Sequence, residues 1–176
     1  MRSALAGFAA LLMTSCAAEA EQPAASEAIA STAPALELTG RVVDRADIIG
    51  AEAEQRLTAR LAAIESETGV QLVIATTPDL AGRAIDAYSF DLANAWGIGD
   101  ANRDDGLLLL VAPNERQVRI DVGSGLEASV RDEEAASIIY EAILPEFRKG
   151  DFESGIANGV ERLAIEVAPA AAKEAA

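Results

Sequence analysis

The chain has 176 residues, which is enough for one domain with its own core and a short targeting or linker segment. Hydrophobic residues make up 51% and aromatic residues only 4%, so we expect a globular core built mainly from Leu, Ile, Val and Ala. The formal net charge of −15 argues against a nucleic-acid-binding protein, which needs a basic face to follow the phosphates. The chain has no His, so any metal is expected to be held by oxygen ligands, which suits calcium or magnesium.

The amino-terminal segment is predicted to be an export signal. Arg2 precedes an apolar run from Ala4 to Met13, which is too short to cross a bilayer as a helix. Residues 1–16 resemble a bacterial lipoprotein signal, in which Cys16, the only cysteine, becomes the lipidated first residue after cleavage. An ordinary secretory signal is the alternative. Both interpretations predict an exported protein. The predicted lipoprotein faces the periplasm from the inner or the outer membrane, and Ala17, in place of the Asp that usually retains lipoproteins at the inner membrane, is compatible with outer-membrane delivery.

Two segments have the composition of unstructured chain. Residues 17–37 are rich in Ala, Glu, Ser and Pro without a sustained apolar period, which predicts a flexible linker. Residues 168–176 are similar and predict a disordered tail. The folded domain is therefore expected over residues 38–167.

Strand-like and helix-like patterns alternate between these ends. Leu57, Leu61 and Ile64 recur at helical spacing, whereas GLLLLVA at 106–112 is a continuous apolar run typical of a buried strand. The expected strands are 40–44, 70–77, 106–112 and 117–122, and the expected helices are 51–68, 85–96, 133–144 (capped by Asp132 and ended by Pro145) and 152–167. The predicted fold is a single α/β domain, a three-layer αβα sandwich with a mixed central sheet.

Acidic residues gather in the loop before the strand at 106–112. PNER at 113–116 predicts a turn between antiparallel strands, so this loop is expected to lie beside the segment GSGLE that follows the strand at 117–122. Mutual repulsion between carboxylates at one end of a sheet would be relieved by a divalent cation or by raised pKa values. The predicted cluster contains Asp100, Asp104, Asp105, Glu127 and Asp132. Asp44 would join this cluster only if the order of the strands places it at the same end of the sheet.

Six ordered motifs then identify a family resemblance. They are Gly40–Ala46, Glu67–Val73, Trp96–Gly99, Asp104–Leu109, Arg119–Glu127 and Pro145–Asp151. Together they resemble the TPM domain family over residues 38–167. Ser124 and Ala128 depart from the family pattern, whereas Asp44, Asp105, Glu127 and Asp132 match it. The resemblance implies an αβα sandwich that is exported and tied to a membrane, in a family whose members include a plant acid phosphatase, an animal receptor auxiliary protein and bacterial domains with bound calcium.

Three functional interpretations follow from these observations. The first is a non-catalytic module that binds calcium or another hard divalent cation through Asp44, Asp104, Asp105, Glu127 and Asp132 and supports a membrane-associated protein complex. The second is a metal-assisted acid phosphatase acting on phosphate monoesters, with Asp104 or Asp105 as the reactive acid. Its candidate phosphate clamps are Arg103, Arg116, Arg119 and Arg131. The third is that the acids form only a polar turn and a helix cap.

Overall fold

The structure, a computed structural model, describes residues 36–168. The predicted signal at 1–16 with Cys16, nearly all of the predicted linker and nearly all of the predicted tail lie outside this part of the chain. Within the described residues, no helix combines the length and the apolar character needed to span a bilayer.

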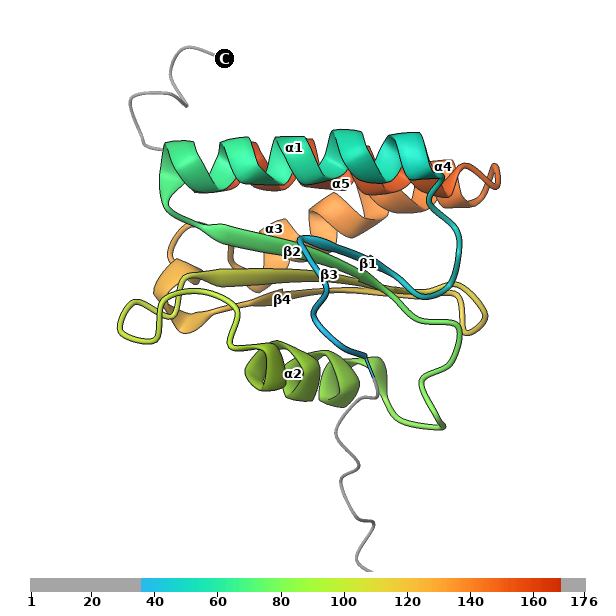
Figure 1. Ribbon diagram of the computed structural model, residues 1–176, viewed down its shortest axis with the longest axis horizontal. Coiled ribbons are helices and arrows are strands. Elements are labelled where there is room, and N and C mark those ends of the chain that lie inside the picture. Colours follow the sequence, from blue (N-terminus) through green and yellow to red (C-terminus); the bar gives the residue numbers. More distant parts are fainter. Residues whose placement is uncertain (1–35, 169–176) are drawn as a thin grey trace, which may run out of the picture. The chain divides into compact units, whose positions relative to one another are not determined.

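A mixed four-stranded sheet forms the centre of the domain (Figure 1). Its strands are β1 (Val42–Asp44), β2 (Gln71–Thr76), β3 (Gly106–Ala112) and β4 (Gln117–Val122), arranged in the order β1-β2-β3-β4. The first three strands run parallel, and β4 pairs antiparallel with β3. The predicted mixed sheet and the predicted hairpin are therefore confirmed.

Helices cover both faces of this sheet (Figure 1). One layer contains α1 (Ala51–Thr68), α3 (Asp132–Ile138), the π-helical segment η2 (Ile139–Ile143), α4 (Leu144–Phe147) and α5 (Phe152–Val167). The other layer is α2 (Ile85–Trp96), and a short 3₁₀ helix, η1 (Ser124–Leu126), follows β4. The domain is thus the three-layer αβα sandwich that the sequence predicts.

The two helical layers explain the continuous apolar runs of the inner strands. Successive strand residues point to opposite faces, so Leu109 packs in the core beneath α1 and α5, while Leu110 packs in the core beneath α2. Both side chains are fully buried. Trp96, the last residue of α2, packs against the edge of the second core, and its indole N–H donates to the carbonyl oxygen of Leu36 at 3.0 Å.

The predicted helix at 133–144 differs from the structure at both ends. Asp132 is the first helical residue and Arg131 holds the cap position, so Asp132 does not cap this helix. Pro145 does not end it either, because the π-helical turn of η2 precedes the proline and the chain stays helical to Phe147. Proline lacks an N–H and its ring clashes with a regular α-helical turn before it; the wider π turn accommodates both effects.

Candidate functional site

The loop before β3 lies directly against the segment that follows β4. Leu107 pairs with Val122 in the hairpin register, and the N–H of Gly123 donates to the carbonyl oxygen of Gly106 at 2.9 Å. The N–H of Gly125 donates in turn to the carbonyl oxygen of Asp104, also at 2.9 Å. The adjacency that the sequence predicts from the hairpin is confirmed.

This contact requires glycine at position 125. A Cβ added there would lie 1.8 Å from the carbonyl oxygen of Arg103 and 3.0 Å from that of Asp104. Any larger residue would therefore push the loop away from η1.

Asp104 connects the loop to the start of η1. Its Oδ2 accepts a hydrogen bond from the backbone N–H of Ser124 at 2.9 Å. Hydrogen bonds from the Ser124 side chain and backbone hold the pKa of Asp104 below its usual range, so this carboxylate is ionised at neutral pH. Its backbone is in the left-handed region, with φ of 48°, a conformation that Asp adopts more readily than most residues.

Asp100 and Asp105 hold the loop in shape. Oδ1 of Asp100 accepts from the N–H groups of Asn102 at 2.9 Å and Arg103 at 3.2 Å, and these bonds lower the pKa of Asp100. Asp105 is buried; its Oδ1 accepts from the N–H of Asp100 at 2.8 Å, and its Oδ2 pairs with Nε of Arg103 at 2.7 Å. The carboxylates of Asp100 and Asp105 therefore already have partners within the loop, namely backbone N–H groups and one arginine.

The structure separates the predicted metal ligands. Asp44 is at the carboxyl end of β1, where it pairs with Thr76, whereas Gly106 pairs with Gln71 at the other end of the parallel strands. Asp44 instead accepts hydrogen bonds from the Thr76 hydroxyl and from the N–H of Ile49 at 2.8 Å. The two remaining predicted ligands, Glu127 after η1 and Asp132 at the start of α3, are exposed. Within residues 36–168, no group of three or more Asp, Glu, His or Cys side chains is positioned to hold a metal ion.

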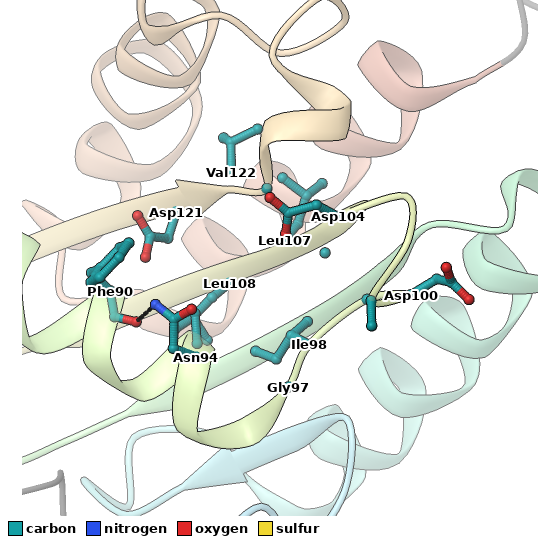
Figure 2. Close-up of a pocket in the computed structure, with 15 residues that line it drawn as sticks. Phe90, Asn94, Gly97, Ile98, Asp100, Asp104, Leu107, Leu108, Asp121 and Val122 are labelled. Atoms are coloured by element: carbon teal, nitrogen blue, oxygen red, sulfur yellow. Dashed lines mark hydrogen bonds between the residues drawn. The ribbon is translucent and has the colours of Figure 1, made fainter.

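A pocket of about 230 Å³ lies between α2, the loop before β3 (residues 97–105, here called the acidic loop) and the β3–β4 hairpin (Figure 2). Its apolar lining includes Phe90, which is 62% exposed, and Ile98. Its acidic lining residues are Asp100, Asp104 and Asp121, and Figure 2 shows Asp104 and Asp121 at the β-hairpin with Asp100 farther along the loop. Of the five predicted ligands, only Asp104 lines this pocket.

Asp121 is the pocket acid that the sequence analysis did not select. Its side chain is only 15% exposed, and burial raises its pKa despite the neighbouring guanidinium of Arg119 at 3.7 Å. Arg119 and Asp121 are two residues apart in β4 and therefore lie on the same face of the sheet. In the structure α2 packs against β4, and Nε of Arg119 is buried without a hydrogen-bond partner among the described residues.

Comparison with known families agrees with the predicted resemblance. The family model of the TPM domain matches residues 42–166, which is most of the chain. The chain belongs to the TPM domain family. Its TPM domain has no significant match among curated proteins.

Solved structures share the TPM domain fold. The N-terminal domain of a P. gingivalis protein has a TM-score of 0.69 and 30% identity, covering 73% of this chain and 82% of that one. The N-terminal domain of the cg2496 protein of Corynebacterium glutamicum has a TM-score of 0.58 and 16% identity, with coverage of 83% and 84%. The BA42 protein of Bizionia argentinensis has a TM-score of 0.60 and 19% identity, with coverage of 68% and 81%. The last two similarities concern the fold alone.

Proposed function

We propose that this TPM domain binds a hard divalent cation such as calcium in the acidic pocket beside the loop before β3. In this proposal the protein is exported, is held at a membrane through lipidated Cys16 and supports a membrane-associated protein complex on the periplasmic side. The observation that carries the cation proposal is that Asp100, Asp104 and Asp121 line one pocket whose described lining contains no Lys or Arg.

The charges of these carboxylates support a cation as the ligand. Asp104 is kept ionised by the hydrogen bonds from Ser124, and Asp121 pays a burial cost when it ionises. A divalent cation would be attracted by the charge of Asp104 and would offset the cost of ionising the partly buried Asp121. Calcium takes about six to eight oxygen ligands, so backbone carbonyls and water would complete the shell. Because the three carboxylates do not already form a compact ligand group, the proposal implies that they converge when the cation binds.

The phosphatase hypothesis has weaker support from the candidate arginine clamps. Arg103 pairs with Asp105, Arg119 lies beside Asp121, and Arg131 pairs with Glu134. The fourth candidate, Arg116, belongs to the β3–β4 turn at the opposite end of the hairpin. Arginines already paired with carboxylates are poorly placed to hold phosphoryl oxygens, so the non-catalytic function is the better supported of the two.

Calorimetric titration with calcium tests the proposal. Asp104→Asn and Asp121→Asn should each weaken calcium binding about tenfold or more, because each removes a charged oxygen ligand without changing side-chain size. Asp132→Asn is the matched control, since it removes the same charge from an exposed position outside the pocket lining, and it should leave the affinity nearly unchanged.

Two outcomes would overturn the proposal. One is the absence of calcium or magnesium binding to the native protein. The other is an equal loss of affinity in all three variants, which would indicate a diffuse attraction to the net negative charge rather than a pocket site. The same samples are assayed with a generic phosphate monoester, and turnover lost in Asp104→Asn would favour the phosphatase instead.

A further inference from the structure

A groove lies at one end of the β3–β4 hairpin, and the acidic pocket lies at the other end. The groove has a volume of about 560 Å³ and is formed by the β3–β4 turn, the start of β4, α4 and the start of α5. The rings of Phe147 and Phe152 line it, with their centroids 4.9 Å apart, and Leu144, Val111 and Val118 add apolar surface. Aromatic and aliphatic side chains in a concave site favour an apolar side chain as the ligand group.

Two arginines accompany this apolar lining. Arg116 and Arg148 both line the groove, and both are exposed. Other basic side chains of the domain, such as Arg41, Arg60 and Lys149, are paired with Glu residues. Within residues 36–168, Arg116 and Arg148 form no ion pair and no side-chain hydrogen bond. Two guanidinium groups without partners beside an apolar groove, in a chain of net charge −15, complement a ligand that joins an apolar group to an anion.

The adjoining strand also has an unpaired edge. β4 has β3 as its only strand neighbour in the described sheet. The bond from Gly123 N to Gly106 O fixes which residues of β4 face β3, so by alternation the backbone groups of Val118, Ile120 and Val122 face away from β3. Such a row of backbone donors and acceptors is the template for an added strand.

We propose that β4 and this groove together bind the extended carboxyl-terminal segment of a partner protein. A segment antiparallel to β4 runs from the Val122 end toward Gln117, so its terminal carboxylate arrives between Arg116 and Arg148. Its last apolar side chain then packs on Phe147 and Phe152. A fatty acid would satisfy the arginines and the groove but not the backbone row, which is why a peptide is the ligand class. This site does not depend on cation binding in the acidic pocket.

The test uses the full chain, labelled with ¹⁵N, and synthetic peptides of about eight residues with alternating Val and Thr that end in Leu, Val, Ile or Phe. At least one peptide with a free carboxylate should shift the amide signals of Val118, Ile120 and Val122. The same peptide with a carboxyl-terminal amide should bind about tenfold more weakly, because its charge-assisted bonds are lost. Chelation with EDTA should leave this binding unchanged, which separates its failure from failure of the cation site.

Matched variants locate the site. Arg116→Gln and Arg148→Gln should each weaken binding of the free-carboxylate peptide about tenfold, whereas Arg162→Gln, an exposed arginine of α5 outside the groove, should not. The proposal is overturned if no peptide binds, if acid and amide forms bind equally, or if the three β4 amides do not shift. Binding of oleate at the groove without any peptide binding would also overturn it, since the ligand would then be a lipid.

Discussion

Neighbouring aspartates in the loop before β3 have different physical tasks. Asp105 is buried and holds the loop through the N–H of Asp100 and the guanidinium of Arg103. Asp104 lines the pocket and is held ionised by Ser124. Asp121 reaches the same pocket from β4, where burial opposes its ionisation. At the scale of single residues, therefore, Asp121 is the pocket acid whose charge is least favourable without a cation.

We predict that Asp121→Asn raises the free energy of unfolding at pH 7 in the absence of divalent cations. Burial raises the pKa of Asp121 in the folded state above its unfolded value, so ionisation costs stability as pH rises through the folded pKa. That cost is absent below the unfolded pKa of about 4, and the advantage of the variant should disappear there. Urea unfolding across a pH series measures it.

Glu127→Gln provides the control for this measurement, because Glu127 is exposed and outside the pocket lining. It should show no comparable gain. A variant Asp121→Asn that is less stable than the native protein at pH 7 would contradict the prediction and show that the contact with Arg119 outweighs the burial cost. Saturating calcium should narrow or reverse the difference if the cation proposal is correct, since only the native protein gains a ligand.

Contact between the acidic loop and η1 determines the shape of the pocket at the scale of elements. We predict that Gly125→Ala destabilises the domain by about 2–3 kcal/mol, because the added Cβ would lie 1.8 Å from the Arg103 carbonyl oxygen. The loop must move to relieve this overlap, so calcium affinity should fall as well. Urea unfolding and calorimetric titration on the same variant measure both effects.

Gly40→Ala is the matched control for this substitution. The nearest heavy atom to a Cβ at Gly40 is the carbonyl oxygen of Val42 at 4.0 Å, so the change should stay within about 0.5 kcal/mol. Equal stability of the two variants would mean that the loop yields without cost and that its contact with η1 does not fix the pocket.

Periodicity accounts for what the sequence predicts well among the elements. The predicted helices at 51–68, 85–96 and 152–167 coincide with α1, α2 and α5, because each has a regular apolar stripe and a terminal glycine or proline nearby. The sequence predicts that a helix ends before Pro145, because proline is not compatible with the interior of a regular α-helix. The π-helical turn before Pro145 is not regular α-helix, so this expectation does not apply there.

The candidate site was predictable only in part, and the reason is tertiary. The hairpin alone predicts that Asp104 lies beside η1, because the loop before β3 and the segment after β4 meet at the same end of the hairpin. Exclusion of Asp44 needs the strand order, which no local pattern contains. Inclusion of Asp121 needs the position of α2 over β4, which leaves this strand residue only partly exposed.

At the scale of the whole molecule, the acidic pocket and the arginine-lined groove lie at opposite ends of one hairpin. The loop before β3 begins the first end, and the β3–β4 turn makes the second. A cation and a peptide could therefore occupy the domain at the same time. If the protein is attached to a membrane, these two ends of the hairpin would be the surfaces that determine which partners the domain binds.

If Cys16 is lipidated as proposed, we predict that Cys16→Ser abolishes membrane attachment without changing the folded domain. A thiol is required for lipidation, so the serine variant should lose the mass of the lipid and move from the membrane to the soluble fraction of the periplasm. Mass spectrometry of the mature protein and fractionation of cells measure this. Ser15→Ala, which keeps the thiol, is the control, and an unmodified Cys16 in the native protein would favour the ordinary secretory signal.

Trp96 gives this domain a built-in optical reporter. It is the only tryptophan of the chain, it ends α2 next to Gly97 and Ile98 of the acidic pocket, and its indole donates to Leu36 at 3.0 Å. Its emission wavelength should therefore respond both to rearrangement of the pocket and to release of the segment around Leu36. Stopped-flow fluorescence could time either event in the unlabelled protein, at concentrations too low for calorimetry.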